Sequence, residues 1–439
     1  MLARTHPASH APQPWMRNFV RSAAIRTWQF LHAFWLMIGM SLAILLLVES
    51  CVRVQRSISE RASGVRPGAA PAGDPQAKMP WFDEFTKEYD ATRPQRWKSY
   101  LYWGREPSFK GRYVNIDSAG HRITPQAKNA EGPVARVFFF GGSTMWGTAQ
   151  RDDHTIPAEA ARRLMTLAAP LNRIEVTNFG ESGYVTTQEL IELELQLRAG
   201  QRPNVVVFYD GINDVGTTVQ FGAPGIPQNE SKRVSEFAMG RALDRSGFAR
   251  GLKKDLTAEG ILLREGFNQL ALVDWIKSKK GSPPLTFISA DSAARSTARV
   301  YAENMRIVEA LSKAYGFQAI YVWQPSIHAT PKPLTKFEER IRNGIKNNPF
   351  ESRIRETQLA IPPIVDSAMA TIAPGRFVDA TSLFVNDTMS VFVDRIGHNT
   401  EASVPKIVDA FWPALEAAVQ RSRAGVAAEA PVNARRRTQ

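Results

Sequence analysis

Cysteine is nearly missing from this sequence. Its 439 residues include one, Cys51, so no disulfide can form within the chain. The spacings of cysteine and histidine that are typical of zinc sites are missing too. Asp152, Asp153 and His154 are metal-ligand types in a row, but we interpret them as a solvated loop. We therefore expect no metal site.

Patterns typical of nucleic-acid binding are also lacking, because the sequence has no helix-turn-helix, zinc-finger or RNP motif. The chain does carry a net charge of +13, from 55 basic and 42 acidic residues. Much of this excess lies at the two ends of the chain, where it suits the surface of an anionic membrane. We predict no nucleic-acid partner.

One stretch lacks charge altogether. Residues 28–48 contain no Lys, Arg, Asp or Glu, and as a helix they would extend about 32 Å, enough to cross a bilayer core. A cleaved signal peptide is the alternative, although its apolar region is usually shorter, about 7–15 residues. A lipid on Cys51 is a further alternative, which Glu49 fits badly. We favour an uncleaved anchor; four arginines on each side leave its orientation undecided.

Composition divides the chain into five parts. We expect a basic arm, a transmembrane helix, a flexible linker rich in Ala, Pro and Gly, one large folded domain, and a basic disordered tail. The boundaries are 1–27, 28–48, 49–78, 79–421 and 422–439, with an insertion in the large domain at about 215–290.

Within the large domain, short apolar strands alternate with amphipathic helices. The expected strands are 136–140, 174–178, 204–209, 318–323 and 376–378; the expected helices are 156–167, 187–198, 297–314 and 400–420. This alternation predicts an α/β fold whose parallel sheet is covered on both faces. Functional residues are then expected after the carboxyl ends of the strands.

Polar residues with catalytic chemistry follow three of these strands. Two glycines precede Ser143, so the backbone can turn sharply and present the serine as a nucleophile. After the next strand, Gly183 could donate its N–H to a developing oxyanion, while nearby Ser182 is a rival nucleophile. Asn213 follows the third strand and could supply a side-chain amide.

A base for the serine is expected before the final helix. His398 follows Asp394 there, and a carboxylate can orient an imidazole that takes the serine proton. Three of the other histidines lie in the N-terminal arm or the apolar run, and His154 lies in the loop interpreted above. His121 and His328 stay possible but lack a matching context.

Together these pieces resemble the SGNH (GDSL-like) hydrolase superfamily. The order is serine after the first core strand, glycine after the second, Gly-x-Asn-Asp after the third and Asp…His before the last helix. Segments 113–124 and 323–325 also look like bacterial membrane-anchored members whose nucleophile block reads Gly-Gly-Ser-Thr. The likeness covers about residues 134–215 and 318–420.

This resemblance implies a flavodoxin-like three-layer α/β/α sandwich without a cofactor. It assigns Ser143 as nucleophile, His398 and Asp394 as the rest of a triad, and the Ser143 N–H, the Gly183 N–H and Asn213 as the oxyanion hole. Two features depart from the family. The Gly-Asn that often follows its histidine is replaced by Ser403-Val404, and its carboxylate usually lies three residues before the histidine. Here Arg395 occupies that position and Asp394 lies four before.

The expected function is that of a membrane-tethered serine esterase that removes O-acetyl or other acyl groups from an envelope or exported polysaccharide. An O-acetyltransferase with the same triad is one alternative, and a non-catalytic glycan-binding or scaffold protein is another. Trp146 and Tyr184 lie near the site residues in the sequence and could line an apolar acyl pocket or, equally, stack on sugar rings. Expected partners are an acylated carbohydrate or small ester and polysaccharide-assembly proteins, with the domain on the periplasmic side of the inner membrane.

Overall fold

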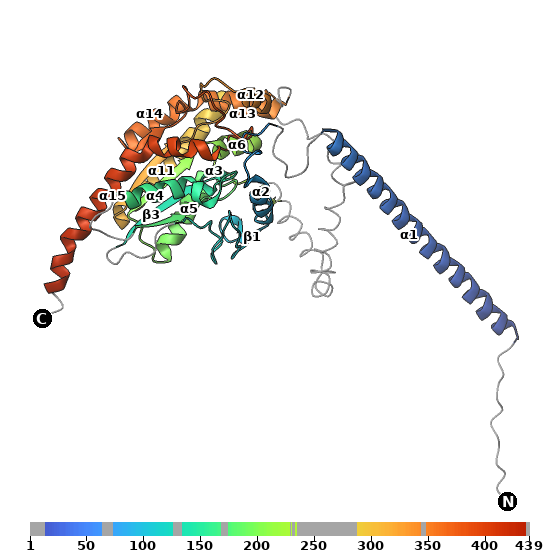
Figure 1. The fold of residues 1–439 in the computed structure, drawn as a ribbon. Coiled ribbons are helices and arrows are strands. Elements are labelled where there is room, and N and C mark those ends of the chain that lie inside the picture. The colour runs from blue at the N-terminus through green and yellow to red at the C-terminus, as the bar shows by residue number, and fades with distance from the viewer. Residues whose placement is uncertain are drawn as a thin grey trace, which may run out of the picture. The chain divides into compact units, whose positions relative to one another are not determined.

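The computed structural model describes residues 14–63, 73–125, 134–167, 174–228, 230, 233–234, 288–343 and 348–435 (Figure 1). The chain divides into two compact units, and each is described by itself. The first contains helix α1 (Pro14–Ser63). The second contains every other described helix and strand.

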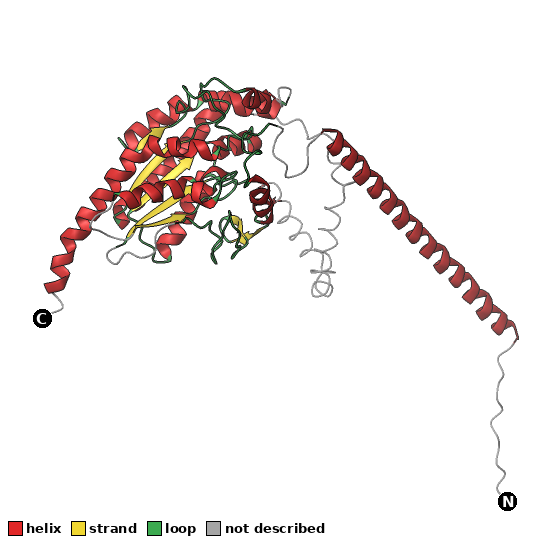
Figure 2. Ribbon diagram, in the orientation of Figure 1, coloured by secondary structure: helices red, strands yellow, loops and turns green. Residues whose placement is uncertain are grey.

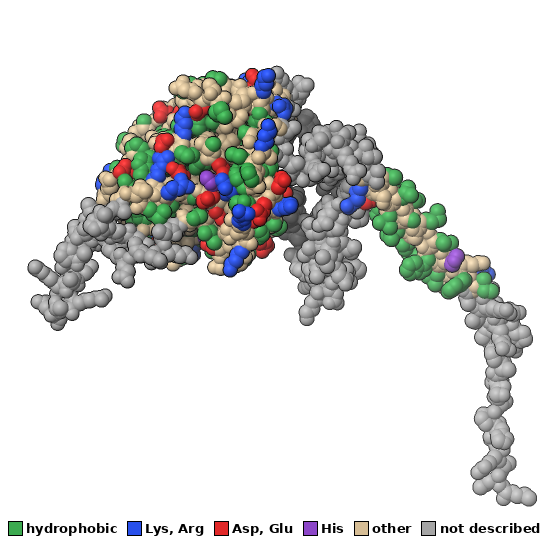
Figure 3. Space-filling model, viewed as in Figure 1, with side chains coloured by type: hydrophobic (Ala, Val, Ile, Leu, Met, Phe, Trp, Pro, Cys, Tyr) green, Lys and Arg blue, Asp and Glu red, His purple; other side chains and the backbone are tan. Residues whose placement is uncertain are grey.

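Helix α1 contains an apolar segment, Ile25–Arg53, with a mean hydropathy of 2.3. Hydrophobic side chains cover its visible surface (Figure 3). The segment is long and apolar enough to cross a membrane, a property that a signal sequence shares. The helix continues to Ser63, so the flexible linker expected to begin at residue 49 is helical over its first part. Residues 64–72 lie outside the described ones.

The second unit is built on a parallel sheet of five strands in the order β4-β3-β5-β6-β7. This is the flavodoxin order, in which the first strand of the sheet along the chain, here β3, lies second from one edge. The strands are β3 (Ala135–Gly141), β4 (Ile174–Asn178), β5 (Val205–Asp210), β6 (Gln318–Trp323) and β7 (Phe377–Asp379). All four neighbouring pairs are parallel.

Alternation along β3 builds two apolar cores. Val137 and Phe139 belong to the core on one face of the sheet, which is shared with α4 (Ile156–Thr166) and α15 (Val404–Arg435). Phe138 and Phe140 belong to the core on the other face. The helices there are α5 (Thr186–Arg198), α11 (Ala290–Tyr315) and α14 (Pro362–Ile372). Figure 2 shows helices in front of and behind the strands, so the expected three-layer α/β/α sandwich is confirmed.

Two segments interrupt the alternation of strands and helices in this unit. The insertion expected at 215–290 begins inside α6 (Ile212–Phe221), and α11 already begins at Ala290. Most of the remaining insertion, residues 235–287, lies outside the described part. Between β6 and α14 the chain forms α12 (Lys336–Asn343) and α13 (Pro349–Ala360).

The residues before β3 pack on the same unit. They form α2 (Phe82–Ala91) and an antiparallel hairpin of β1 (Gln95–Lys98) and β2 (Tyr102–Arg105). Gln76 donates to the Ala149 carbonyl at 3.0 Å and accepts from the Glu401 N–H at 2.8 Å. The prediction that Gln76 lies in the flexible linker is therefore wrong, because this part of the chain is hydrogen-bonded to the domain.

Candidate active site

Ser143 begins α3 (Ser143–Trp146), directly after β3 and two glycines. Gly142 is required by a close approach: a β-carbon there would lie 2.2 Å from the Asn213 amide nitrogen. As the first residue of a helix, Ser143 has a backbone N–H without an intrahelical acceptor. The sharp turn therefore presents both the hydroxyl and an N–H at the carboxyl edge of the sheet.

The structure brings Ser143, His398 and Asp394 together. The Ser143 Oγ lies 2.6 Å from His398 Nε2, and His398 Nδ1 lies 2.5 Å from Asp394 Oδ2. The carboxylate makes Nδ1 the protonated nitrogen, so Nε2 can accept the serine proton. A hydroxyl, an imidazole and a carboxylate thus form one hydrogen-bonded chain.

A tight loop carries the histidine and its carboxylate. Asp394 Oδ1 accepts the backbone N–H groups of Ile396, Gly397 and His398 at 3.0–3.2 Å. Gly397 has a φ of +102°, a conformation that absorbs the extra residue between Asp394 and His398. Arg395 points away to Glu351, at 3.3 Å. The unusual spacing therefore still delivers a carboxylate to the imidazole.

Electrostatics keep this carboxylate charged. Burial would raise the pKa of Asp394, but the charge and hydrogen bonds of His398 and the backbone N–H of Gly397 outweigh it and lower the pKa below its usual value. The side chain also keeps 31% exposure, which limits the desolvation. Asp394 is thus an anion across the neutral pH range.

Gly183 and Asn213 line the same cleft as the serine and carry N–H donors. Gly183 has a φ of +81°, in the left-handed region that favours glycine, and its N–H has no hydrogen-bond acceptor among the described residues. Asn213 donates one amide N–H to the Tyr184 carbonyl at 2.8 Å, which fixes the side chain and leaves its second N–H for another acceptor. These groups and the Ser143 N–H fit an oxyanion hole.

The triad opens into a cleft of about 380 Å³. Ser143, Ser182, Gly183, Asn213 and His398 all line it. Other lining residues were not anticipated from the sequence. Thr148, Gln228 and Ile396 come from later loops, whereas Tyr89, Arg93, Gln95 and Trp103 come from α2, the β1–β2 hairpin and the link between them. Only the three-dimensional packing of the segment before β3 against the site identifies these four residues.

The aromatic residues proposed for sugar stacking are not in this cleft. Trp146 is fully buried, with the guanidinium groups of Arg105 and Arg122 at 4.4 and 4.5 Å from its ring. Tyr184 is 2% exposed and donates to the Trp103 carbonyl. That interpretation is wrong, because both rings belong to the packing behind the site, whereas Tyr89 and Trp103 face the cleft.

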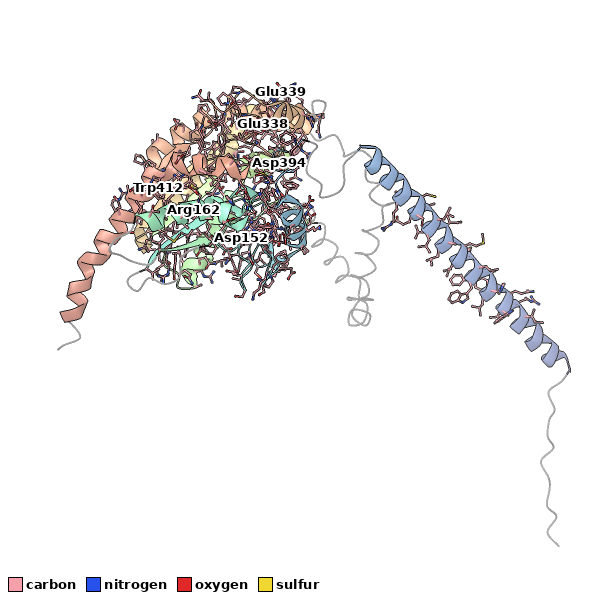
Figure 4. All side chains as sticks on the ribbon, viewed as in Figure 1. Asp152, Arg162, Glu338, Glu339, Asp394 and Trp412 are labelled. Carbon is pink, nitrogen blue, oxygen red and sulfur yellow. The ribbon has the colours of Figure 1, made fainter. Side chains whose placement is uncertain are left out.

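Buried Arg122 supports the nucleophile turn. Its guanidinium donates to the carbonyls of Trp146, Gly147 and Gln150 and to Asp152, which is labelled in Figure 4. Asp152 is itself buried, so the interpretation of this residue as part of a solvated loop is wrong. Burial raises the pKa of Asp152 and lowers that of Arg122, and their pairing opposes both shifts. No cluster of possible metal ligands occurs among the described residues.

The rival residues lack the triad's partners. Ser182 Oγ accepts from Arg105 at 2.5 Å, and no histidine contacts it among the described residues. His121 lies near Asp117, at 3.7 Å. His328 lines a neighbouring pocket of about 280 Å³, where burial and then the charges of Arg355 and Arg342 lower its pKa to about 4.

Three carboxyl groups lie buried beneath the oxyanion side of the site. Asp214 accepts the N–H and hydroxyl of Thr186, and burial still raises its pKa to about 6. Burial and mutual repulsion raise the pKa of Glu189 and Asp210 well above their usual values. Asp214 therefore holds the Asn213 loop to the start of α5, away from the cleft.

Comparison with known proteins gives structural neighbours only. No protein-family model matches the sequence, and no curated protein matches it. An acetyl xylan esterase is similar over 64% of this chain and 98% of its own, at 13% identity and a TM-score of 0.33. A catalytic mutant of an acetylxylan esterase from Geobacillus stearothermophilus matches over 64% and 94%, at 14% identity and 0.33. A G-D-S-L family protein from Desulfitobacterium hafniense matches over 63% and 97%, at 9% identity and 0.32.

Proposed function

We propose that this protein is a serine ester hydrolase of the SGNH type. The observation that carries the proposal is the hydrogen-bonded chain from Ser143 through His398 to Asp394, beside three donors suited to an oxyanion. The non-catalytic alternative drew its support from the displaced carboxylate, and the observed Asp394–His398 contact removes that support.

The geometry supports acyl transfer in two steps. His398 Nε2 takes the Ser143 proton as Oγ attacks the ester carbonyl, and the N–H groups of Ser143, Gly183 and Asn213 hold the resulting oxyanion. His398 then protonates the leaving alcohol, which produces an acyl-enzyme on Ser143. Water, deprotonated by the same imidazole, releases the carboxylic acid and restores the serine.

We further propose that the substrate is an O-acylated polysaccharide and that α1 tethers the enzyme to the inner membrane with its catalytic unit in the periplasm. The apolar segment of α1 supports the tether. The open cleft, with Tyr89 and Trp103 in its lining, suits a carbohydrate ester. An uncleaved anchor predicts that the full chain stays in the membrane fraction after carbonate washing, whereas a cleaved leader predicts a shorter soluble protein.

The experiment for the chemistry is labelling with a fluorophosphonate probe together with turnover of p-nitrophenyl acetate. The wild type is expected to be labelled and active, and Ser143→Ala to be neither, with an unchanged circular dichroism spectrum. Ser182→Ala is the matched control and should keep both properties. Labelling that depends on Ser182 instead of Ser143 would reject this assignment of the nucleophile.

A further inference from the structure

The β1–β2 hairpin presents exposed aromatic side chains beside the catalytic cleft. In the described part of the second unit, three aromatic residues are largely exposed: Trp97 at 58%, Tyr100 at 69% and Tyr315 at 39%. Two of these three lie in one hairpin of eleven residues, Gln95–Arg105. Exposing aromatic side chains to water is unfavourable, so a cluster of them on a surface marks a binding site.

The hairpin connects this surface to the site. Trp97 pairs directly with Trp103 across the two strands, and side chains of directly opposite residues are neighbours on one face. Gln95 lies two residues before Trp97 and therefore shares that face. Both Gln95 and Trp103 line the cleft that contains Ser143. The aromatic surface thus continues outward from the cleft, from Trp103 to Trp97.

The exposed Trp97 ring is held in place. Tyr102 stacks against it with ring centroids 5.6 Å apart, and the Arg233 guanidinium lies 5.5 Å from its centroid. Tyr100 and Tyr102 both have positive φ angles, of 68° and 73°, which residues with side chains rarely adopt. Because its contacts already order the Trp97 ring, a ligand that binds there pays less to order it.

The chemistry of this strip favours a sugar chain. Gln95 supplies a polar neighbour on the same face of the hairpin, and the Arg233 guanidinium lies over the Trp97 ring. The C–H faces of a pyranose pack on aromatic rings while its hydroxyl groups meet such polar edges. A lipid surface would require a broader apolar patch than two rings supply.

We propose that Trp97 and Tyr100 form a saccharide-binding strip that extends the active-site cleft and selects esters carried on polymeric glycans. This inference rests on the proposed esterase function, since the strip would position a chain whose ester lies at Ser143. The enzyme should accordingly prefer long acylated oligosaccharides over short ones. Its turnover of small esters should not depend on Trp97 or Tyr100.

The test compares the full-length protein and four variants on four kinds of substrate: p-nitrophenyl acetate and acetylated xylo-, manno- and chito-oligosaccharides of two and six sugars. Wild type is expected to favour the hexamers of at least one series. Trp97→Ala should lower kcat/KM on those hexamers about two- to tenfold, mainly through KM. Its turnover of p-nitrophenyl acetate should not change.

The controls separate binding from folding. Tyr315→Ala removes another exposed ring with an arginine over it, Arg202 at 5.1 Å. It should leave the ratio of kcat/KM on hexamers to kcat/KM on dimers unchanged in every series. Trp97→Tyr should restore most of the hexamer preference. If Trp97→Ala fails to fold, Tyr100→Ala provides the same comparison on the neighbouring ring.

Two results overturn the inference. One is equal kcat/KM on dimers and hexamers in every series, or turnover of no oligosaccharide. The other is a hexamer preference that Trp97→Ala and Tyr100→Ala leave intact. In both cases hydrolysis of p-nitrophenyl acetate would leave the esterase proposal standing. If that activity is also missing, binding of the hexamers by the Ser143→Ala protein in affinity electrophoresis tests the strip independently.

Discussion

Asp394 contacts His398 twice, through Oδ2 to the ring Nδ1 at 2.5 Å and through Oδ1 to the backbone N–H at 3.2 Å. The same carboxylate thus fixes both the ring and the loop that carries it, which lies near the Asp394 label in Figure 4. Val393 closes the loop by donating its N–H to the His398 carbonyl at 2.9 Å. This double contact suggests that the imidazole is oriented before substrate arrives.

Asp394→Asn should reduce kcat strongly, because an amide can favour the wrong imidazole tautomer; a comparable change costs about 10⁴-fold. The measurement is steady-state hydrolysis of p-nitrophenyl acetate. Asp387→Asn and Asp379→Asn are controls, since Asp387 pairs with Lys406 and Asp379 accepts from Thr381. Activity of Asp394→Asn within about threefold of wild type would leave a Ser143–His398 dyad.

Gly397→Ala tests how the loop accommodates its extra residue. A β-carbon at Gly397 would lie 2.9 Å from Ile212 Cδ1, and φ is +102°. Strain of this kind costs about 1–3 kcal/mol, so thermal stability and kcat should both fall. A variant with unchanged kcat would show that the loop tolerates another backbone conformation.

Asn213→Ala should lower kcat by about 10²–10³ with little effect on KM, as expected for an oxyanion donor. The side chain also donates to the Tyr184 carbonyl, so circular dichroism and thermal unfolding must accompany the kinetics. A loss that appears in KM alone, or in folding alone, would contradict a role in the transition state.

Arg122→Met should be strongly destabilising. It leaves Asp152 and three backbone carbonyls without their buried donor, and breaking a buried ion pair costs about 3–5 kcal/mol. Chemical unfolding followed by tryptophan fluorescence measures this cost. Arg112→Met is the control because Arg112 is exposed and its pair with Glu84 lies at the surface; it should change stability by less than about 1 kcal/mol.

Asp214 predicts a dependence of stability on pH. Burial raises its pKa from 3.8 to about 6, so the folded state binds more protons than the unfolded state between these values. The stability that this group contributes is therefore fully present below about pH 4 and is lost as pH rises through 6. Asp214→Asn should remove this contribution to the change of stability with pH between pH 4 and 6, as measured by thermal unfolding. If the pH dependence is unchanged in the variant, other groups cause it.

The sequence predicted the sheet and the central residues well because both depend on local patterns. The strands expected at 174–178 and 318–323 match β4 and β6 in their observed bounds, and the loops after strands identified the residues around Ser143. Gly397 directly precedes His398 in the sequence, and a residue that tolerates positive φ can absorb the extra position.

What the sequence could not predict depends on long-range packing. Arg122 looks like an ordinary surface arginine in the sequence, yet it is 1% exposed because carbonyls and Asp152 surround it. Trp146 next to the nucleophile looked accessible, but two arginines cover its ring. Trp103 and Gln95 lie about forty residues before Ser143 in the chain, and no local pattern indicates that their hairpin folds over the cleft.

The place of Gln76 has a mechanical consequence. Its side chain bridges Ala149, just after the nucleophile turn, and Glu401, just after the histidine loop. Gln76 thus forms a hydrogen-bonded bridge between the segment that carries Ser143 and the segment that carries His398. These two segments must keep their relative positions for proton transfer. Cutting the chain at Met79 would remove this bridge. A protein shortened at its N-terminus should therefore retain residues 73–78, so that the Ser143 and His398 segments stay aligned.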